Sequence, residues 1–389
     1  MPQEPTPRPP LPIHFLAGLF LLACFAAQCL YVASHAPLTD DERTFASPGP
    51  QFAGHEFSKP PDPFHSPLIY HLAQFPVRHG TVPWFDFVGP RYTHRWLLRL
   101  PFLIFGILRG ASLWFVARRL FGRLPGLFAL ALYCFSPRMV AEGSHISPDG
   151  LAAWGVFGVV YLAIASAHTL YASPGLLTWH DRWRRPILMG VSFGIAVAAN
   201  FVSFWIALPL AIAFLLYLVP GRRREAAAML GICGVLAVIV FFAVYRLSSA
   251  AVVHDVSDYL RLAPVRLEDY FRLHHEALRE AVHGTNYGMF AMTIAGLLCW
   301  LIWRRARWFA NTAALIALFA VLLLTCAGSA QQILGFWAPA TAFLFMFLAG
   351  IFADALDTAQ RKLAIAVSVA LLLVHIAFGL ARTLTALSS

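Results

Sequence analysis

Long apolar runs separated by short polar segments make up most of the chain. A helix needs about 20 mostly apolar residues to cross the hydrocarbon core of a membrane, so each run is a candidate span. We count about eleven spans, in a range of roughly ten to twelve because one run is short and two adjoin. They cover residues 12–34, 97–117, 124–140, 149–172, 186–203, 204–220, 226–247, 288–303, 308–327, 331–350 and 363–384. The pattern predicts an all-α polytopic membrane protein.

Composition supports this prediction and excludes other classes. Apolar residues make up 59% of the 389 positions and charged residues only 12%, which rules out a water-soluble enzyme. The net charge of +10 does not indicate nucleic-acid binding, because the arginines lie in short clusters between apolar runs. All the cysteines lie within apolar segments, so we expect them to pack in the core without forming disulfides.

The basic clusters predict the orientation of the chain. With a cytoplasmic N-terminus, every cytoplasmic loop is basic, as the positive-inside bias requires. These clusters are Arg118/Arg119/Arg123, Arg182/Arg184/Arg185, Arg222/Arg223/Arg224, Arg304/Arg305/Arg307 and Arg361/Lys362. We therefore expect a bacterial-type inner or plasma membrane protein with a Pro-rich cytoplasmic tail over residues 1–11. Residues 12–389 then form a single membrane domain, with extracytoplasmic loops at 35–96 and 248–287.

The first span has two interpretations. Ser34-His35-Ala36 offers small residues at a spacing seen in cleaved signal peptides. The apolar stretch from Leu11 to Tyr31 is long for a signal peptide and favours an uncleaved anchor.

Acidic residues at the outer membrane surface are the first candidates for chemistry. Asp40, Asp41 and Glu42 follow the first span by a few residues. Crowded carboxylates raise one another's pKa toward working pH, which suits a general base acting on a lipid-carried substrate. A solvated acidic turn is the alternative. The short loop from Glu142 to Gly150 faces the same side, and its Asp149 either joins this site or stabilises a helix N-terminus.

Each long outer loop also contains an amphipathic stretch. In the first, prolines precede His65, and Leu68, Ile69, Leu72, Phe75 and Val77 are expected to rest on the membrane as an interfacial helix. In the second, residues 266–280 show apolar side chains at helical spacing, and we expect a similar helix there.

The order of these features resembles the GT-C superfamily of membrane glycosyltransferases. The similarity is greatest to its protein O-mannosyltransferase-like and aminoarabinose transferase-like branch, over roughly residues 12–210. The matching motifs are Asp41-Glu42-Arg43-Thr44-Phe45, His65-Ser66-Pro67-Leu68-Ile69-Tyr70, Arg99-Leu100-Pro101, Phe121-Gly122-Arg123, Ser136-Pro137 and Pro148-Asp149. Each motif is unspecific alone, whereas their order and placement on one topology are distinctive.

The resemblance implies an activity. Such enzymes move a sugar, here a hexosyl or pentosyl group, from a polyprenyl-phosphate donor to a hydroxyl of a lipid, glycan or protein. We expect Asp41 to be the base and Glu42 or Asp40 to orient it or to hold a metal. Asp149 would be the second acidic group, which binds the acceptor or an ion. The membrane lipid and an acceptor lipid or glycan are the expected partners, and no nucleic acid is expected. The donor phosphate would be bound by Arg99, then by Arg95, Arg91 and His65.

No cofactor follows with certainty from the sequence. A divalent cation is possible at His65, Glu142, His145 and Asp149, since the last two lie four residues apart and would share a helical face.

Two departures from the family pattern keep other functions open. Asn200 stands where many such proteins have a lysine, and residues 332–339 replace an Arg-Tyr-Leu-Leu-Pro stretch. A non-catalytic scaffold of GT-C shape is therefore one alternative. A transporter or lipid flippase is the other, although the carboxylates gather on one outer face instead of near the span centres.

Overall fold

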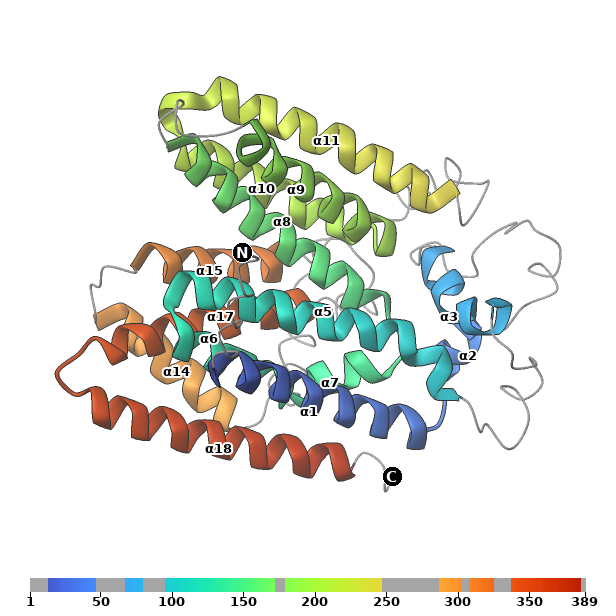
Figure 1. Cartoon of the computed structure of the whole chain (residues 1–389), viewed down its shortest axis with the longest axis horizontal. Coiled ribbons are helices and arrows are strands. Elements are labelled where there is room, and N and C mark those ends of the chain that lie inside the picture. The colour runs from blue at the N-terminus through green and yellow to red at the C-terminus, as the bar shows by residue number, and fades with distance from the viewer. Residues whose placement is uncertain are drawn as a thin grey trace, which may run out of the picture.

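The computed structural model describes residues 13–46, 67–79, 95–171, 179–246, 287–302, 308–324 and 337–385, and this part of the chain is helical with no β-strand (Figure 1). The helices are α1 (Ile13–His35), α2 (Asp40–Ala46), α3 (Pro67–His79), α5 (Arg95–Phe121), α6 (Arg123–Cys134), α7 (Pro137–Ser144), α8 (Pro148–Tyr171), α9 (Trp179–Ala199), α10 (Val202–Leu218), η2 (Pro220–Arg222), α11 (Arg223–Arg246), α14 (Tyr287–Ile302), α15 (Trp308–Leu324), α17 (Trp337–Leu356) and α18 (Arg361–Thr385).

The prediction of an all-α membrane protein is confirmed, whereas the number of spans is not established. Five described helices are long and apolar enough to cross a membrane, namely α1, α5, α8, α11 and α18, or six spans if the bent pair α6 and α7 counts as one. Shorter apolar helices cover Val202–Leu216, Gly288–Ile302, Ala310–Leu322 and Ala340–Leu356. The count of about eleven therefore stays a prediction.

A proline produces the bend between α6 and α7. Pro137 is the first residue of α7, where its missing N–H costs no hydrogen bond, and its ring prevents α6 from continuing through Ser136. The two helix axes differ by 63°. As a result α7 leads into residues 145–147, which lie against α2 at one end of the bundle.

The predicted basic clusters and the predicted acidic run lie at opposite ends of the bundle. The start of α8 is at the acidic end, because the Ile146 N–H donates to Glu42 of α2. The other end of α8 is tied to the basic clusters, since Arg185 donates to the Ala165 carbonyl and Arg222 to that of Leu170. In Figure 1, α2 and α3 lie at one end, and α11 and α18 begin at the other. This separation agrees with the predicted orientation, although the sidedness itself stays a prediction.

The helix after His65 packs partly against protein instead of lying wholly on the membrane. Ile69, Tyr70 and Ala73 of α3 are buried, so the prediction that Ile69 rests on lipid is wrong. These side chains belong to a small apolar cluster with Leu38, Phe45, Leu98, Phe102 and Ile146. Phe75 is 56% exposed, as expected. The amphipathic stretch at 266–280 and Val77, whose side chain has no described position, lie outside what the structure describes.

Close approach of α8 and α9 depends on Gly155. A Cβ at this position would lie 2.6 Å from the Ala196 Cβ and 2.7 Å from the Ser192 carbonyl oxygen. The two backbones can approach this closely because no side chain separates them, as is common in membrane helix pairs.

We predict that Gly155→Ala lowers the free energy of unfolding by about 1–2 kcal/mol, because overpacking costs about 1–3 kcal/mol and improved helix preference returns up to about 1 kcal/mol. Gly231→Ala in α11 is the control, since a Cβ there would meet nothing within 4 Å. Thermal unfolding in detergent measures both variants. Equal midpoints for the two would show that the α8–α9 contact is looser than described.

Candidate functional site

The acidic run after the first span forms α2, and the sequence Thr39-Asp40-Asp41-Glu42 forms a capping box at its start. The Glu42 N–H donates to Thr39 Oγ1 at 3.2 Å, and the Thr39 N–H donates to Glu42 Oε2 at 3.0 Å. Each side chain thus satisfies an N–H that the first turn of a helix leaves without a partner. The box fixes which way each acidic side chain points.

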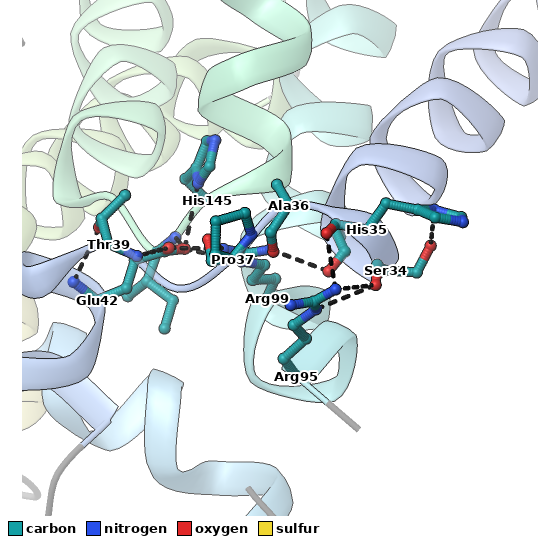
Figure 2. Close-up of polar contacts among 11 residues, drawn as sticks. Ser34, His35, Ala36, Pro37, Thr39, Glu42, Arg95, Arg99 and His145 are labelled. Atoms are coloured by element: carbon teal, nitrogen blue, oxygen red, sulfur yellow. Dashed lines mark hydrogen bonds and ion pairs between the residues drawn. The ribbon is translucent and has the colours of Figure 1, made fainter. Parts of the chain in front are cut away.

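Glu42 points into the protein and forms a buried ion pair with Arg99 of α5 (Figure 2). Arg99 Nε donates to Oε1 at 2.8 Å and Nη2 donates to Oε2 at 2.6 Å, a two-pronged geometry. Oε1 also accepts the Ile146 N–H at 2.9 Å. Glu42 therefore holds α2, α5 and the segment before α8 together.

Arg99 also caps the C-terminal end of α1. Its Nη1 donates to the Ala33 and Ala36 carbonyls at 2.9 and 3.0 Å, and its Nη2 donates to Pro37 at 2.9 Å. The last carbonyls of a helix lack intrahelical partners and favour a nearby cation. With Glu42 included, every N–H of Arg99 is occupied and the side chain is fully buried. This geometry does not support Arg99 as the first phosphate ligand.

Arg95, one turn earlier in α5, keeps part of its guanidinium accessible. Nε and Nη2 donate to the Ser34 carbonyl at 3.0 and 2.9 Å, and Nη2 also donates to His35 at 2.7 Å. In Figure 2 both arginines point toward the segment from Ser34 to Pro37. No described residue bonds Arg95 Nη1. Arg91 and His65, the remaining predicted phosphate ligands, lie outside the described residues.

The charge on Glu42 is strongly favoured. Burial alone would raise its pKa, yet the contact with His145 and the hydrogen bonds and charge of Arg99 hold it at about 2, below the ordinary 4.5. His145 Nδ1 lies 3.3 Å from Glu42 Oε1. An acid that stays ionised and fully bonded has no lone pair free to accept a substrate proton, so this geometry makes Glu42 a positioning residue.

The two neighbouring acids point outward. Asp40 pairs with Arg43 at 3.2 Å, and its side chain is 96% exposed. Asp41 is also exposed, and no described residue forms a hydrogen bond or ion pair with its carboxylate. Of the predicted acidic run, Asp41 is therefore the carboxylate that bonds no described residue.

Asp149 lies half-buried in the first turn of α8. Its N–H donates to Ser147 Oγ at 3.1 Å, which caps the helix, and its Oδ1 accepts a hydrogen bond from Asn200 Nδ2 at 3.3 Å. Ile146, three residues earlier, is bonded to Glu42. The predicted placement of Asp149 and Asp41 at one end of the bundle is thus seen in the structure.

The predicted metal ligands are engaged elsewhere. Glu142 is held between Arg109 at 2.8 Å and Arg138 at 3.0 Å. His145 contacts Glu42, and Asp149 bonds Asn200. Within the described ranges no three His, Cys, Asp or Glu side chains gather as metal ligands would. The arginine partners of Glu142 oppose cation binding there. Sequence reasoning missed them, although Arg109 is a charge near the middle of the predicted span 97–117.

Comparison with known proteins places this arrangement in a fold class. Residues 92–245 match the family described as dolichyl-phosphate-mannose-protein mannosyltransferase. No curated protein matches the chain in sequence.

Solved structures show the same fold. ArnT from Cupriavidus metallidurans bound to undecaprenyl phosphate superposes with a TM-score of 0.62 at 13% identity, over 89% of this chain and 61% of that one. The archaeal oligosaccharyltransferase AglB from Archaeoglobus fulgidus, in complex with an inhibitory peptide and a dolichol-phosphate, gives 0.58 at 11% identity, over 95% of this chain and 56% of that one. Both are GT-C glycosyltransferases, so the resemblance is confirmed and the chain has the GT-C fold. It spans about three-fifths of the length of these relatives.

We predict that Glu42→Gln lowers the free energy of unfolding by about 3 kcal/mol or more, because it leaves the Arg99 charge buried without its counter-ion. Asp41→Asn, at an exposed neighbouring position, should change it by less than about 0.5 kcal/mol. Thermal unfolding in detergent distinguishes the two. A Glu42→Gln protein as stable as wild type would contradict the assigned structural role.

The depressed pKa of Glu42 also predicts acid sensitivity. The unfolded carboxyl binds its proton near 4.5 and the folded one only near 2, so the stabilisation is complete above about 4.5 and is lost as the pH falls toward 2. Midpoints of thermal unfolding for wild type should drop through this window. Glu42→Gln should show a flatter dependence, whereas a parallel decline in both proteins would assign the acid sensitivity to other groups.

Proposed function

We propose that the protein is a membrane glycosyltransferase that moves a sugar from a polyprenyl-phosphate donor to a hydroxyl acceptor on the extracytoplasmic face. The observation that carries this proposal is the placement of the exposed Asp41 carboxylate beside Glu42, which is bonded to both Arg99 and the segment leading to Asp149. The GT-C fold and the family match support the class of reaction.

The roles of the acidic residues follow from their surroundings. Asp41 is the general base: it takes the proton of the acceptor hydroxyl as that oxygen bonds to the anomeric carbon. The bond between this carbon and the phosphate oxygen breaks, and the polyprenyl phosphate departs with the electron pair. Glu42 positions α2 without exchanging protons. Asp149 is the second acidic group, which binds the acceptor.

The departing phosphate needs positive charge at the same end of the bundle. Arg95 is the candidate with an accessible guanidinium nitrogen, since Arg99 uses all its donors within the protein. Arg91 and His65, which precede α5 in sequence, complete the proposed set. The undecaprenyl phosphate and dolichol-phosphate bound to ArnT and AglB support a lipid-linked donor for this chain.

The orientation, the sugar and the acceptor belong to the same proposal. A cytoplasmic N-terminus places the basic end of the bundle inside and the acidic end outside, in agreement with the positive-inside bias. The transferred group is a hexosyl or pentosyl sugar, and a lipid or small glycan is the acceptor.

We predict that Asp41→Asn lowers transfer by about a hundredfold or more, the typical contribution of a general base. The assay follows radiolabelled sugar from a panel of polyprenyl-phosphate sugars into membrane extract at equal protein abundance. Asp40→Asn is the matched control, because Asp40 lies in the same turn and is equally open to solvent, and it should retain transfer. Full transfer by Asp41→Asn would remove Asp41 from the role of base.

A further inference from the structure

Asn200 is buried at the turn between α9 and α10, with 2% of its surface exposed. Arg185 near the start of α9 and Arg222 just after α10 both bond carbonyls at the basic end of α8. The turn that joins the two helices therefore lies at the opposite end, where α8 begins. A buried amide in this place needs partners for both its oxygen and its nitrogen.

The amide of Asn200 has both partners, and one of them fixes its orientation. Oδ1 accepts the Val202 N–H at 3.0 Å, which caps the start of α10 in an Asx turn. With the oxygen turned toward α10, the NH2 group faces Asp149 and donates to its Oδ1 at 3.3 Å. The α9–α10 turn thus directs an N–H donor at one carboxylate of the site.

The kind of donor matters for the chemistry. Arg99 cancels the charge of Glu42, whereas an amide donates a hydrogen bond without adding a positive charge. Asn200 therefore orients Asp149 and leaves the negative charge of that carboxylate uncompensated by this contact. The contact occupies one lone pair of Oδ1 and sets no cation beside the carboxylate.

We propose that Asn200 is a positioning residue for sugar transfer, which fixes the side chain of Asp149 through a neutral N–H donor supplied by the α9–α10 turn. This role rests on the proposed function of Asp149.

The test replaces Asn200 by aspartate, which has the same shape and can still accept the Val202 N–H. Asn200→Asp loses the donor and sets a second carboxylate beside Asp149, so the two groups must share a proton. At about pH 8 we expect transfer to fall by about tenfold to a hundredfold, because a misplacement of about 1 Å costs up to about a hundredfold in rate. On acidification to about pH 5.5 the shared proton restores a donor, and transfer should recover relative to wild type.

Two further variants separate positioning from general damage. Asn200→Leu removes the cap and the donor together, so its transfer should stay low at every pH.

Asn311→Asp is the matched control, because Asn311 is equally buried and donates to Asp354 Oδ2 at 2.7 Å, in a pair formed by α15 and α17. It should lower stability while transfer per folded molecule keeps the wild-type pH profile. His145 and Glu42 are the titratable groups beside the start of α8, and they are unchanged in all variants. Their effect on the pH dependence of transfer is therefore already contained in the wild-type profile.

A measurement independent of transfer checks the pairing itself. A membrane-permeant carbodiimide modifies protonated carboxyl groups, and mass spectrometry locates the label. At about pH 7 we expect more label on the peptides that carry residues 149 and 200 in Asn200→Asp than on the peptide that carries residue 149 in wild type. Absence of label in the variant overturns the proposal. So does a ratio of variant to wild-type transfer that stays constant with pH. If wild type transfers no sugar from any donor, the proposed function fails, and the label still decides whether Asn200 faces Asp149.

Discussion

The ion pair between Glu42 and Arg99 is the interaction on which the acidic end of the bundle depends. Two buried charges are costly apart from each other, and only a partner with matching geometry makes them tolerable. Here each group also bonds backbone atoms. Arg99 donates to carbonyls at the end of α1, and Glu42 accepts hydrogen bonds from the N–H groups of Thr39 and Ile146. A single pair thereby joins the end of α1, all of α2, the start of α5 and the entry to α8.

This arrangement divides the acidic run into structural and chemical parts. The capping box turns Glu42 inward and leaves Asp41 facing outward on the same helical turn. The buried Glu42 thereby fixes the turn, and the Asp41 carboxylate gains a fixed position without being buried. Asp149 is also held in place by neighbouring residues, but through hydrogen bonds to Ser147 and Asn200 instead of an ion pair.

The similarity to ArnT and AglB concerns the fold more than the sequence. At 11–15% identity the superposed structures share the path of the helices over about nine-tenths of this chain. Conserved geometry at such low identity is expected when helices are positioned by apolar length, prolines and close glycine contacts, since many side chains satisfy each of these constraints.

The sequence alone determined the class of fold, the approximate position of most helices and the gathering of acidic residues at one end, whereas the predicted span 124–140 is bent at Pro137. These features depend on local properties: apolar length, proline geometry and the distribution of arginine along the chain. The roles of Arg99, Glu42, Glu142 and Asn200 could not be read in the same way. Whether an arginine meets a phosphate or a carboxylate depends on which helix end lies opposite, and contacts between residues 42 and 99, or 149 and 200, exist only after the bundle has formed. Tertiary structure decided these roles, because a buried charge or amide takes the partner that packing brings within hydrogen-bond distance.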